Sequence, residues 1–433
     1  MTAPGPTPDR GAPPDPATGR LVVVGASLAG LRAVESARKA GFAGSITLVG
    51  VEEHLPYDRP PLSKAHLGAG SGSEPAAPYL REEAHLREEL GVELLLGRPA
   101  TALDTAARVV HVGGREVAYD AVVLATGSTA RRLPGTDHLD GVHPLRTLDD
   151  ARVVRRALEA RARTVVVGAG FIGSEVASAA RGRGLDVTVV EAQPTPLARA
   201  VGAELGAHVA AIHERHGTRL LTGVGVASVE GDGAGRVERV VLDDGTVLPA
   251  DLVVVGIGVV PATGWLEGSG LRLDDGVVCD ETLWAGAPGV WAAGDVVRWP
   301  NATMGETQRL ENWTGAADQG AAAARNALDP AAAAAYATVP FFWSDWYDVR
   351  IQMIGSPVAD EVLVVDGDPT AAGRWVALYR RGDRLIGALA VDAPAEIMKY
   401  RAQVMRGGSW DDALAHAAAR RERAAGRAAG PAS

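Results

Sequence analysis

Two glycine-rich stretches, each followed by an acidic residue, are the parts of this sequence whose residue types and spacing could do chemistry. The first stretch runs from Gly25 to Gly30, and Glu52 follows about 20 residues later. The second runs from Gly168 to Gly173 with the complete glycine fingerprint, and Glu191 follows at about the same distance. Glycines let a backbone approach a pyrophosphate, and the acid accepts hydrogen bonds from ribose hydroxyls. Two dinucleotide sites are therefore predicted.

The flanking sequences have the composition of the strands and helices that such loops require. Leu21 to Val24 is an apolar run without alternation, which indicates a strand buried on both faces of a parallel sheet. Leu31 to Ala40 has helical composition, and Ser45 to Val49 predicts the next strand. A second βαβ unit begins at Thr164, with strands at Val165 to Val167 and Val187 to Val190. In the first loop Ser27 replaces a glycine, and its small side chain still permits close approach.

The acid of the second unit predicts which nicotinamide cofactor binds there. A carboxylate at Glu191 would accept hydrogen bonds from ribose hydroxyls and repel a 2′-phosphate, so NADH is preferred to NADPH. Arg199 is the nearest downstream arginine that could soften this preference.

Three further stretches have features of a ligand site, each with an ordinary structural alternative. In Tyr57 to Lys64 two adjacent prolines fix the backbone before Lys64, which is either a solvated surface lysine or a cation beside a bound ring system. Ala125-Thr126-Gly127 is a small-residue turn after a buried strand, and Gly256 ends a similar strand. Gly294-Asp295 follows a third strand, and Asp295 either caps a turn or holds the ribityl hydroxyls of a flavin.

Composition excludes several classes of function. The net charge of -10 argues against a nucleic-acid partner, and the longest apolar stretches are far shorter than the ~20 residues of a membrane span. Met1 to Gly19 is Pro-rich and predicts a disordered extension rather than a signal peptide, so a cytoplasmic protein is expected. Cys279 is the only cysteine, which excludes an internal disulfide, a Cys-x-x-Cys redox pair and a zinc site, so no metal is expected. Redox chemistry would have to depend on a bound cofactor.

From about Tyr336 the sequence changes character. Strand-like runs within Val339 to Ile354, Val362 to Val365, Trp375 to Tyr379 and Leu385 to Val391 suggest an antiparallel sheet. Pro394 to Met405 predicts a short helix with proline at its start, and Asp411 to Arg427 a terminal helix or frayed tail.

Taken together, these motifs resemble those of the pyridine-nucleotide reductase superfamily, and more narrowly those of the FAD-dependent, NADH-using ferredoxin reductases of bacterial oxygenase systems. The resemblance runs from about Arg20 to about Tyr400 and includes Glu311-Asn312-Trp313 and Phe342-Trp343-Ser344-Asp345. It implies that the first unit binds FAD and the second binds NADH. It also implies that Lys64 lies beside the flavin N5 edge with Glu175 as its carboxylate partner, stabilising the anionic reduced flavin. Trp346 stands where such reductases often carry glutamine, a departure that bears on the surface near the flavin and on acceptor choice.

The residues expected to act are Lys64 and Glu175 in catalysis. Those expected to bind cofactors are Gly25, Ser27, Leu28, Ala29, Gly30, Glu52, Arg59, Pro60, Lys64, Ala125, Thr126, Gly127, Gly168, Gly170, Phe171, Ile172, Gly173, Glu191, Gly256, Gly294, Asp295, Glu311, Asn312, Trp313 and Trp343. For Trp313 and Trp343 the alternative is core packing.

The hypothesis that follows is hydride transfer from NADH to FAD, then transfer of single electrons to a ferredoxin, of [2Fe-2S] or similar type, that feeds an oxygenase. An NADH oxidase, a quinone reductase or a small-molecule reductase on the same scaffold is the alternative, and an apoptosis-inducing-factor-like binding protein is less favoured by the acidic composition. The protein would be a monomer or a homodimer.

The expected fold class is α/β, with two Rossmann-like dinucleotide-binding domains and a C-terminal α+β domain. The domains expected are a disordered extension (1–19), a discontinuous FAD domain (20–146 and 260–329), an NADH domain (147–259), the C-terminal domain (336–410) and an Ala/Arg-rich tail (411–433).

Overall fold

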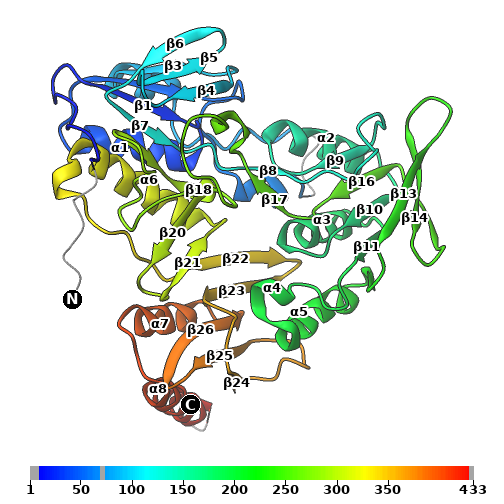
Figure 1. The fold of residues 1–433 in the computed structure, drawn as a ribbon. Helices are drawn as coiled ribbons and strands as arrows, with labels where there is room; N and C mark the ends of the chain where they lie inside the picture. Colours follow the sequence, from blue (N-terminus) through cyan, green and yellow to red (C-terminus); the bar gives the residue numbers. More distant parts are fainter. Residues whose placement is uncertain (1–8, 69–73, 429–433) are drawn as a thin grey trace. The chain divides into compact units, whose positions relative to one another are not determined.

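The computed structural model describes residues 9–68 and 74–428, which belong to two compact units (Figure 1). The first unit comprises residues 1–58, 77–129 and 260–338. The second comprises residues 59–76, 130–259 and 339–433.

The first unit is built on a five-stranded parallel sheet in the order β19-β7-β1-β2-β3. Its strands are β1 (Arg20–Val24), β2 (Ser45–Val49), β3 (Val92–Leu95), β7 (Ala121–Leu124) and β19 (Val290–Ala292). The apolar runs of β1 and β7 are buried along four residues each, as expected of strands covered on both faces.

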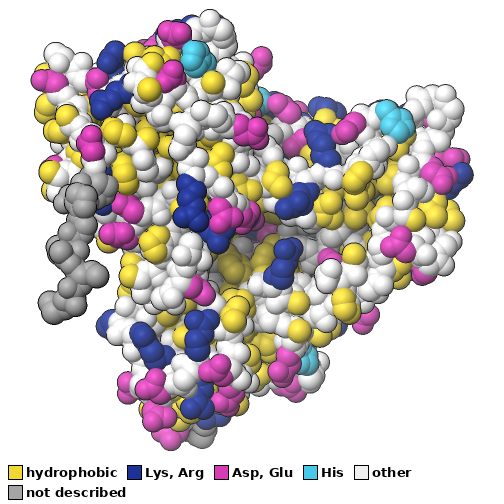
Figure 2. All heavy atoms as spheres, viewed as in Figure 1, with side chains coloured by type: hydrophobic (Ala, Val, Ile, Leu, Met, Phe, Trp, Pro, Cys, Tyr) yellow, Lys and Arg dark blue, Asp and Glu magenta, His cyan; other side chains and the backbone are white. Residues whose placement is uncertain are grey.

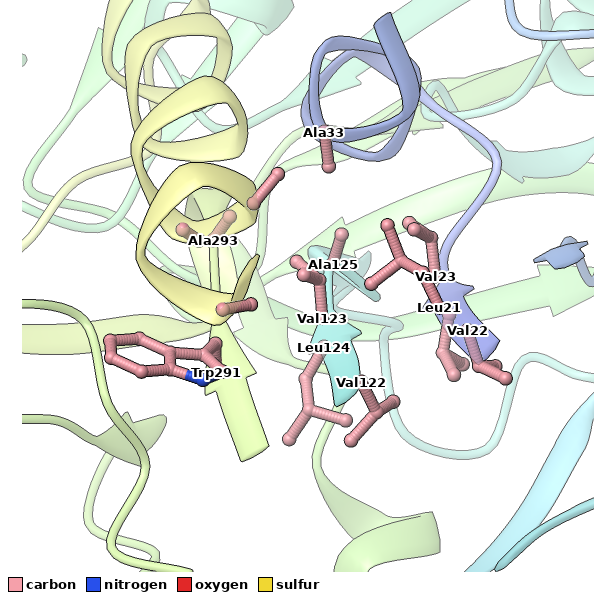
Figure 3. Close-up of a cluster of buried hydrophobic side chains, with 14 of the residues drawn as sticks. Leu21, Val22, Val23, Ala33, Val122, Val123, Leu124, Ala125, Trp291 and Ala293 are labelled. Atoms are coloured by element: carbon pink, nitrogen blue, oxygen red, sulfur yellow. The ribbon is translucent and has the colours of Figure 1, made fainter. Parts of the chain in front are cut away.

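Two helices of the first unit, α1 (Leu28–Lys39) and α6 (Trp313–Leu328), pack closely against each other. A Cβ at Gly320 of α6 would lie 2.1 Å from the Ala29 carbonyl oxygen, so only glycine permits this approach. Side chains of β1 and β7 lie together with Ala33 of α1 and with Trp291 in one buried cluster (Figure 3). This core fixes the ends of the strands from which the first glycine loop and the Ala125 turn emerge.

The second unit contains another five-stranded parallel sheet, in the order β12-β11-β10-β16-β9. Its strands are β9 (Val142–Pro144), β10 (Thr164–Val167), β11 (Val187–Glu191), β12 (Arg219–Thr222) and β16 (Leu252–Val255). The helices nearby are α2 (Leu148–Glu159), α3 (Phe171–Gly182), α4 (Ala198–Val201) and α5 (Ala203–Arg215). Helix α2 begins with a capping box in which Thr147 and Asp150 satisfy each other's backbone N–H groups.

An antiparallel sheet in the order β22-β23-β26-β25-β24 forms the rest of the second unit. Its elements are β22 (Phe341–Trp346), β23 (Val349–Gly355), β24 (Glu361–Asp366), β25 (Trp375–Arg381), β26 (Arg384–Val391), α7 (Pro394–Met405) and α8 (Trp410–Ala428). Residues of α4 and α5, among them Val201, Val209 and Ile212, share one hydrophobic core with Trp346 and other residues of this sheet. The antiparallel sheet and the helices α4 and α5 are therefore packed together within the second unit.

Smaller elements complete the chain. In the first unit these are η2 (His85–Glu89), β4 (Ala100–Asp104), β5 (Val109–Val112), β6 (Arg115–Ala118), η3 (Gly264–Leu266), β18 (Val277–Val278), η4 (Gly294–Val296), β20 (Val297–Asn301), β21 (Glu306–Arg309) and η5 (Pro330–Ala332). In the second unit they are η1 (Pro60–Ser63), β13 (Val226–Gly231), β14 (Val237–Leu242) and β15 (Val247–Pro249). The short strands β8 (Ser128–Ala130) and β17 (Val259–Pro261) span the unit boundaries.

The predicted fold class is confirmed, but three predicted segments differ from the structure. Residues 9–19 are not a disordered extension: the Arg10 carbonyl accepts a hydrogen bond from Gly289, and the Arg10 guanidinium pairs with Asp280 at 2.6 Å. Residues 59–76 and 130–146, predicted in the FAD domain, belong to the second unit. The first eight residues of the predicted extension lie outside the described residues.

Both signs of charge are mixed over the face drawn in Figure 2. Arg163 and Asp251 form one ion pair of the second unit, at 2.6 Å, and the Arg163 guanidinium lowers the pKa of Asp251 to about 2. None of the helices in the described part of the chain is long and apolar enough to cross a membrane.

Candidate functional site

The first glycine loop lies where β1 meets α1, and its terminal glycines are required by the chain itself. Gly25 has a φ of +123°, and a Cβ there would lie 2.0 Å from the Ala125 carbonyl oxygen. A Cβ at Gly30 would lie 1.9 Å from the Gly25 carbonyl oxygen. Ser27, by contrast, has an extended backbone that any residue adopts, so serine causes no backbone strain.

The predicted small-residue turns converge on this loop within the first unit. A Cβ at Gly294 would lie 3.1 Å from the Ala29 side chain, and the Gly294 N–H donates to Gln319 Oε1 at 2.8 Å. The Thr126 hydroxyl donates to the Ala262 carbonyl at 3.0 Å. Because β7 pairs in parallel with both β1 and β19, the turns that follow these strands lie at the same edge of the sheet.

Two predicted carboxylates of the first unit are oriented by hydroxyl donors. Ser128 donates to Asp295 Oδ2 at 2.8 Å, and the Tyr57 hydroxyl donates to Glu52 Oε2 at 2.6 Å. Each carboxylate is thereby held in a defined direction.

The predicted Glu311-Asn312-Trp313 motif lies at the start of α6. The Asn312 side chain caps the helix by accepting the Gly315 N–H at 2.6 Å. Glu311 pairs with Arg309 at 2.6 Å, and the Trp313 indole donates to Asp58 Oδ1 at 2.7 Å. These contacts are structural, so the predicted binding roles of Asn312 and Glu311 would have to use their remaining atoms.

The second glycine loop connects β10 to α3, and Gly170 differs from Gly168 and Gly173 in the space around it. A Cβ at Gly168 would lie 2.4 Å from the Gly256 carbonyl oxygen, and one at Gly173 would lie 2.1 Å from the Gly168 carbonyl oxygen. A Cβ at Gly170 would lie 3.8 Å from the Gly256 carbonyl oxygen, an ordinary van der Waals distance. Internal packing therefore requires glycine at 168 and 173, whereas glycine at 170 keeps space open at the start of the helix.

The acid of the second unit lies beside this loop. Glu191 Oε2 accepts the Ala169 N–H at 2.9 Å, and Oε1 accepts the Gln193 N–H at 2.8 Å. The carboxylate is thus fixed next to the second glycine loop, and its role in holding ribose hydroxyls stays a prediction.

Lys64 and Glu175 form an ion pair within the second unit, with Lys64 Nζ 2.5 Å from Glu175 Oε1. The Glu175 side chain is only 3% exposed, so its charge needs partners. Ser63 donates to Oε2, and Ser344 donates to Oε1 at 2.5 Å. The Asp345 N–H also donates to Oε1, at 3.3 Å. Four donors from two distant segments therefore converge on one buried carboxylate.

Arginines of the NADH-type domain hold the segment that carries Lys64. Arg155 of α2 donates to the His66 carbonyl at 2.8 Å, and Arg183, just after α3, donates to the Leu67 carbonyl at 2.7 Å. Pro60 begins a short 3-10 helix that ends at Ser63, and Arg59 donates to the Arg146 carbonyl at 2.5 Å. The lysine is therefore attached to α2 and α3 rather than carried on a free surface loop.

The aromatic residues predicted near the cofactors differ in their surroundings. Phe171 packs against Phe342 with ring centroids 4.8 Å apart, so its ring belongs to the shared core, whereas Ile172 is 44% exposed. Trp343 is half-buried on β22, with its ring 5.8 Å from that of Phe341. Trp346 is fully buried, so the expectation that it alters a surface near the flavin is wrong.

The sequence interpretation missed the roles of Ser63, Ser344 and His213. Both serines stand inside motifs that were noticed, but their contact with Glu175 depends on tertiary structure. His213 is fully buried between Ser174 and Tyr347, with Nε2 3.0 Å from the Ser174 hydroxyl and Nδ1 2.7 Å from the Tyr347 hydroxyl. Burial, with a smaller effect of His216, lowers the pKa of His213 to about 4, so this imidazole is neutral at pH 7.

The residues present fit the two cofactors. The first turns of α1 and α3 consist of uncharged residues, as suits helix N-termini that face phosphates. The uncrowded position at Gly170 would admit close approach of a pyrophosphate, and the carboxylates of Glu52, Asp295 and Glu191, each oriented by hydrogen bonds, suit ribose and ribityl hydroxyls. The fold and its loops define a reductase with two dinucleotide sites.

Comparison with known proteins identifies the family. Residues 19–320 match the pyridine nucleotide-disulphide oxidoreductase family, and residues 341–423 match the reductase C-terminal domain. The chain belongs to the pyridine nucleotide-disulphide oxidoreductase family, as its motifs predicted.

Similar proteins include reductases of several bacterial oxygenase systems. The chain is 37% identical over 383 residues to rhodocoxin reductase from Rhodococcus erythropolis, covering 88% of each protein. It is 36% identical over 380 residues to the benzene 1,2-dioxygenase system ferredoxin–NAD(+) reductase subunit from Pseudomonas putida, covering 87% of this chain and 90% of that one. The crystal structure of the covalent putidaredoxin reductase–putidaredoxin complex matches with a TM-score of 0.84 and 32% identity, covering 90% of this chain and 94% of that one.

Proposed function

We propose that this protein is an FAD-dependent NADH:ferredoxin reductase that supplies single electrons to an oxygenase system. When bound, FAD supplies the chemistry that divides a hydride into two single electrons. The observation that carries the proposal is the ion pair between Lys64 and the buried Glu175, which lies on the helix that begins at the second glycine loop.

The chain's own residues would act by binding and orientation. The loops at Gly25 and Gly168 would receive the two pyrophosphates, and Asp295, held by Ser128, would bind ribityl hydroxyls. Lys64 would provide a fixed positive charge because Glu175 restrains its ammonium group. Glu191 would select NADH.

The cysteine content argues for a one-electron acceptor rather than a disulfide substrate. A member of this family that reduces disulfides through its own redox pair needs two cysteines, and this chain has only Cys279. Cys279 is buried, and burial raises the pKa of its thiol, so it is not a reactive thiolate. The names of the similar reductases support a ferredoxin as acceptor.

The test is anaerobic stopped-flow mixing of the FAD-loaded protein with NADH, followed by a [2Fe-2S] ferredoxin. Fast flavin reduction and then fast ferredoxin reduction are expected. Fast flavin reduction with no transfer to several ferredoxins, but rapid turnover with quinone or oxygen, would refute the ferredoxin assignment and favour an oxidase or quinone reductase.

Lys64→Met tests the role of the Lys64–Glu175 ion pair in the same assay. We expect the rate constant of flavin reduction by NADH to fall at least tenfold, the change expected when a positioned charge worth about 1.4 kcal/mol or more is removed. Lys39→Met, at the exposed end of α1, is the matched control and should not change the rate. An unchanged rate in Lys64→Met would remove Lys64 from the mechanism.

We also propose that the protein functions in the cytoplasm, where NADH is supplied. Fractionation of cells that express the untagged protein tests this, and recovery in a membrane or periplasmic fraction would contradict it.

A further inference from the structure

The hydrogen-bond network around Glu175 continues beyond the four groups that touch it. Trp346 lies two residues after Ser344 on β22, and its indole N–H donates to Ser344 Oγ at 2.9 Å. Ser344 in turn donates to Glu175 Oε1 at 2.5 Å. A serine hydroxyl has one hydrogen, so accepting from the indole leaves that hydrogen for the carboxylate.

The same carboxylate oxygen holds the lysine. Glu175 Oε1 is 2.5 Å from Lys64 Nζ as well as from Ser344 Oγ. A shift of the serine hydroxyl would therefore move the oxygen that fixes the ammonium group. Consecutive hydrogen bonds in a buried setting also strengthen one another, so losing the indole donor weakens the bond from Ser344 to Glu175.

The Trp346 ring is also fixed by packing against a buried histidine. Its ring is fully buried and stacks on His213, with ring centroids 4.9 Å apart and planes at 29°. His213 is fixed by Ser174 and Tyr347, and its imidazole is neutral at pH 7, so the indole packs on an uncharged ring. The indole N–H cannot turn away from Ser344 without disturbing the core that α5 shares with the C-terminal sheet.

We infer that Trp346 is a positioning residue for the Lys64–Glu175 pair: its indole N–H directs the Ser344 hydroxyl onto the carboxylate oxygen that holds the lysine ammonium. Through Trp346 and Ser344, the C-terminal domain would thus help to position the lysine used in hydride transfer, in addition to packing against α4 and α5. This inference rests on the proposed function, because its readout is flavin reduction by NADH.

The first test is Trp346→Phe, which keeps an aromatic ring in the core and removes only the donor. We expect the limiting rate constant of flavin reduction to fall about fivefold, the effect of one hydrogen bond of ordinary net strength. The NADH concentration for half-saturation should change less than twofold, because phenylalanine keeps an aromatic ring beside Phe171 of the second glycine loop, whose centroid lies 6.4 Å from that of Trp346. Trp375→Phe is the matched control, because Trp375 is a second buried tryptophan in the same core, on β25, and its loss should leave the rate unchanged.

A double-mutant cycle tests whether Trp346 acts through Ser344. Ser344→Ala should slow flavin reduction at least as much as Trp346→Phe, and adding Trp346→Phe to Ser344→Ala should produce no further loss. Additive effects of the two substitutions would overturn the inference, because they would show that Trp346 acts by another route.

A second pair of variants covers the case in which Trp346→Phe does not load FAD. Trp346→Gln and Trp346→Leu are close in size, and only glutamine carries an N–H donor. Flavin reduction in Trp346→Gln should remain at least threefold faster than in Trp346→Leu. Equal rates in this pair would assign Trp346 a packing role only and overturn the inference.

Failure of the inference and failure of the proposed function give different results. If the unaltered protein does not reduce its flavin rapidly with NADH, the proposed function fails. If it does, and Trp346→Phe equals the unaltered protein, only the inference fails.

Discussion

Replacing Glu191 with glutamine should largely abolish the discrimination between NADH and NADPH. The carboxylate is fixed by N–H groups of Ala169 and Gln193 at 2.9 and 2.8 Å, so it cannot swing away from an added phosphate. Glutamine has the same shape and can still accept one of these hydrogen bonds, so the main change is the loss of one negative charge.

The size of the effect follows from Coulomb's law. A 2′-phosphate carries a charge of about -1.5 at neutral pH, and we take its distance from a ribose-binding carboxylate as about 5 Å. Glu191 is half-buried, so an effective dielectric constant of about 40, between the surface and bulk values, gives a repulsion of about 2.5 kcal/mol. That energy corresponds to a ~60-fold preference for NADH, which the glutamine variant should lose.

The assay is kcat/KM for NADH and for NADPH with an artificial acceptor, measured at two ionic strengths. Asp186→Asn is the matched control, since it removes an exposed carboxylate just before the first residue of β11, whereas Glu191 is the last residue of that strand. The two side chains are ~16 Å apart along the strand, beyond the Debye length at physiological salt. A ratio of the two kcat/KM values that changes less than threefold in Glu191→Gln would refute the electrostatic account of NADH preference.

Two further predictions follow from the glycine loop and from the buried histidine. Gly170→Ala should leave the thermal unfolding temperature nearly unchanged but weaken NADH binding at least tenfold, as measured by titration of flavin reduction, because its Cβ fits the fold but enters the ligand's space. Gly173→Ala should instead destabilise the domain, because its Cβ would lie 2.1 Å from the Gly168 carbonyl oxygen. Equal behaviour of the two variants would contradict this assignment. Because the folded-state pKa of His213 is about 4, below its ordinary 6.5, its contribution to stability is fully present above pH 6.5 and is lost as the pH falls towards 4. Urea titrations at pH 6.5 and pH 4 should therefore show about 3 kcal/mol more acid destabilisation in the unaltered protein than in His213→Gln. Equal losses in the two proteins would show that His213 is not buried as a neutral group.

The sequence was informative wherever a local constraint determined the structure. The strand from Ser45 to Val49 and the helix from Pro394 to Met405 have the bounds that were predicted, because apolar runs and an N-terminal proline act within a few residues. The two glycine loops were recognised because their φ angles and close approaches depend on neighbouring residues.

Features that depend on distant parts of the chain were not predictable in this way. The Pro-rich composition of residues 9–19 suggested disorder, but their order comes from contacts with Gly289 and Asp280, about 270 residues away. The donors to Glu175 include Ser344, 169 residues further along the chain, and no periodicity in the sequence relates these two positions. Trp346 was expected to affect the surface near the flavin because similar reductases often carry glutamine there, and only the packing against α5 shows that it is buried.

The shared core of α4, α5 and the C-terminal sheet limits how this reductase can be recombined with its relatives. Residues 341–423, which match the reductase C-terminal domain, could be taken for a module that can be exchanged between relatives. An exchange at that point would, however, cut through the packing of Trp346 on His213 and the bond from Ser344 to Glu175. Chimeras made to change the electron acceptor should therefore transfer α3 to α5 together with the C-terminal sheet, as one inherited block.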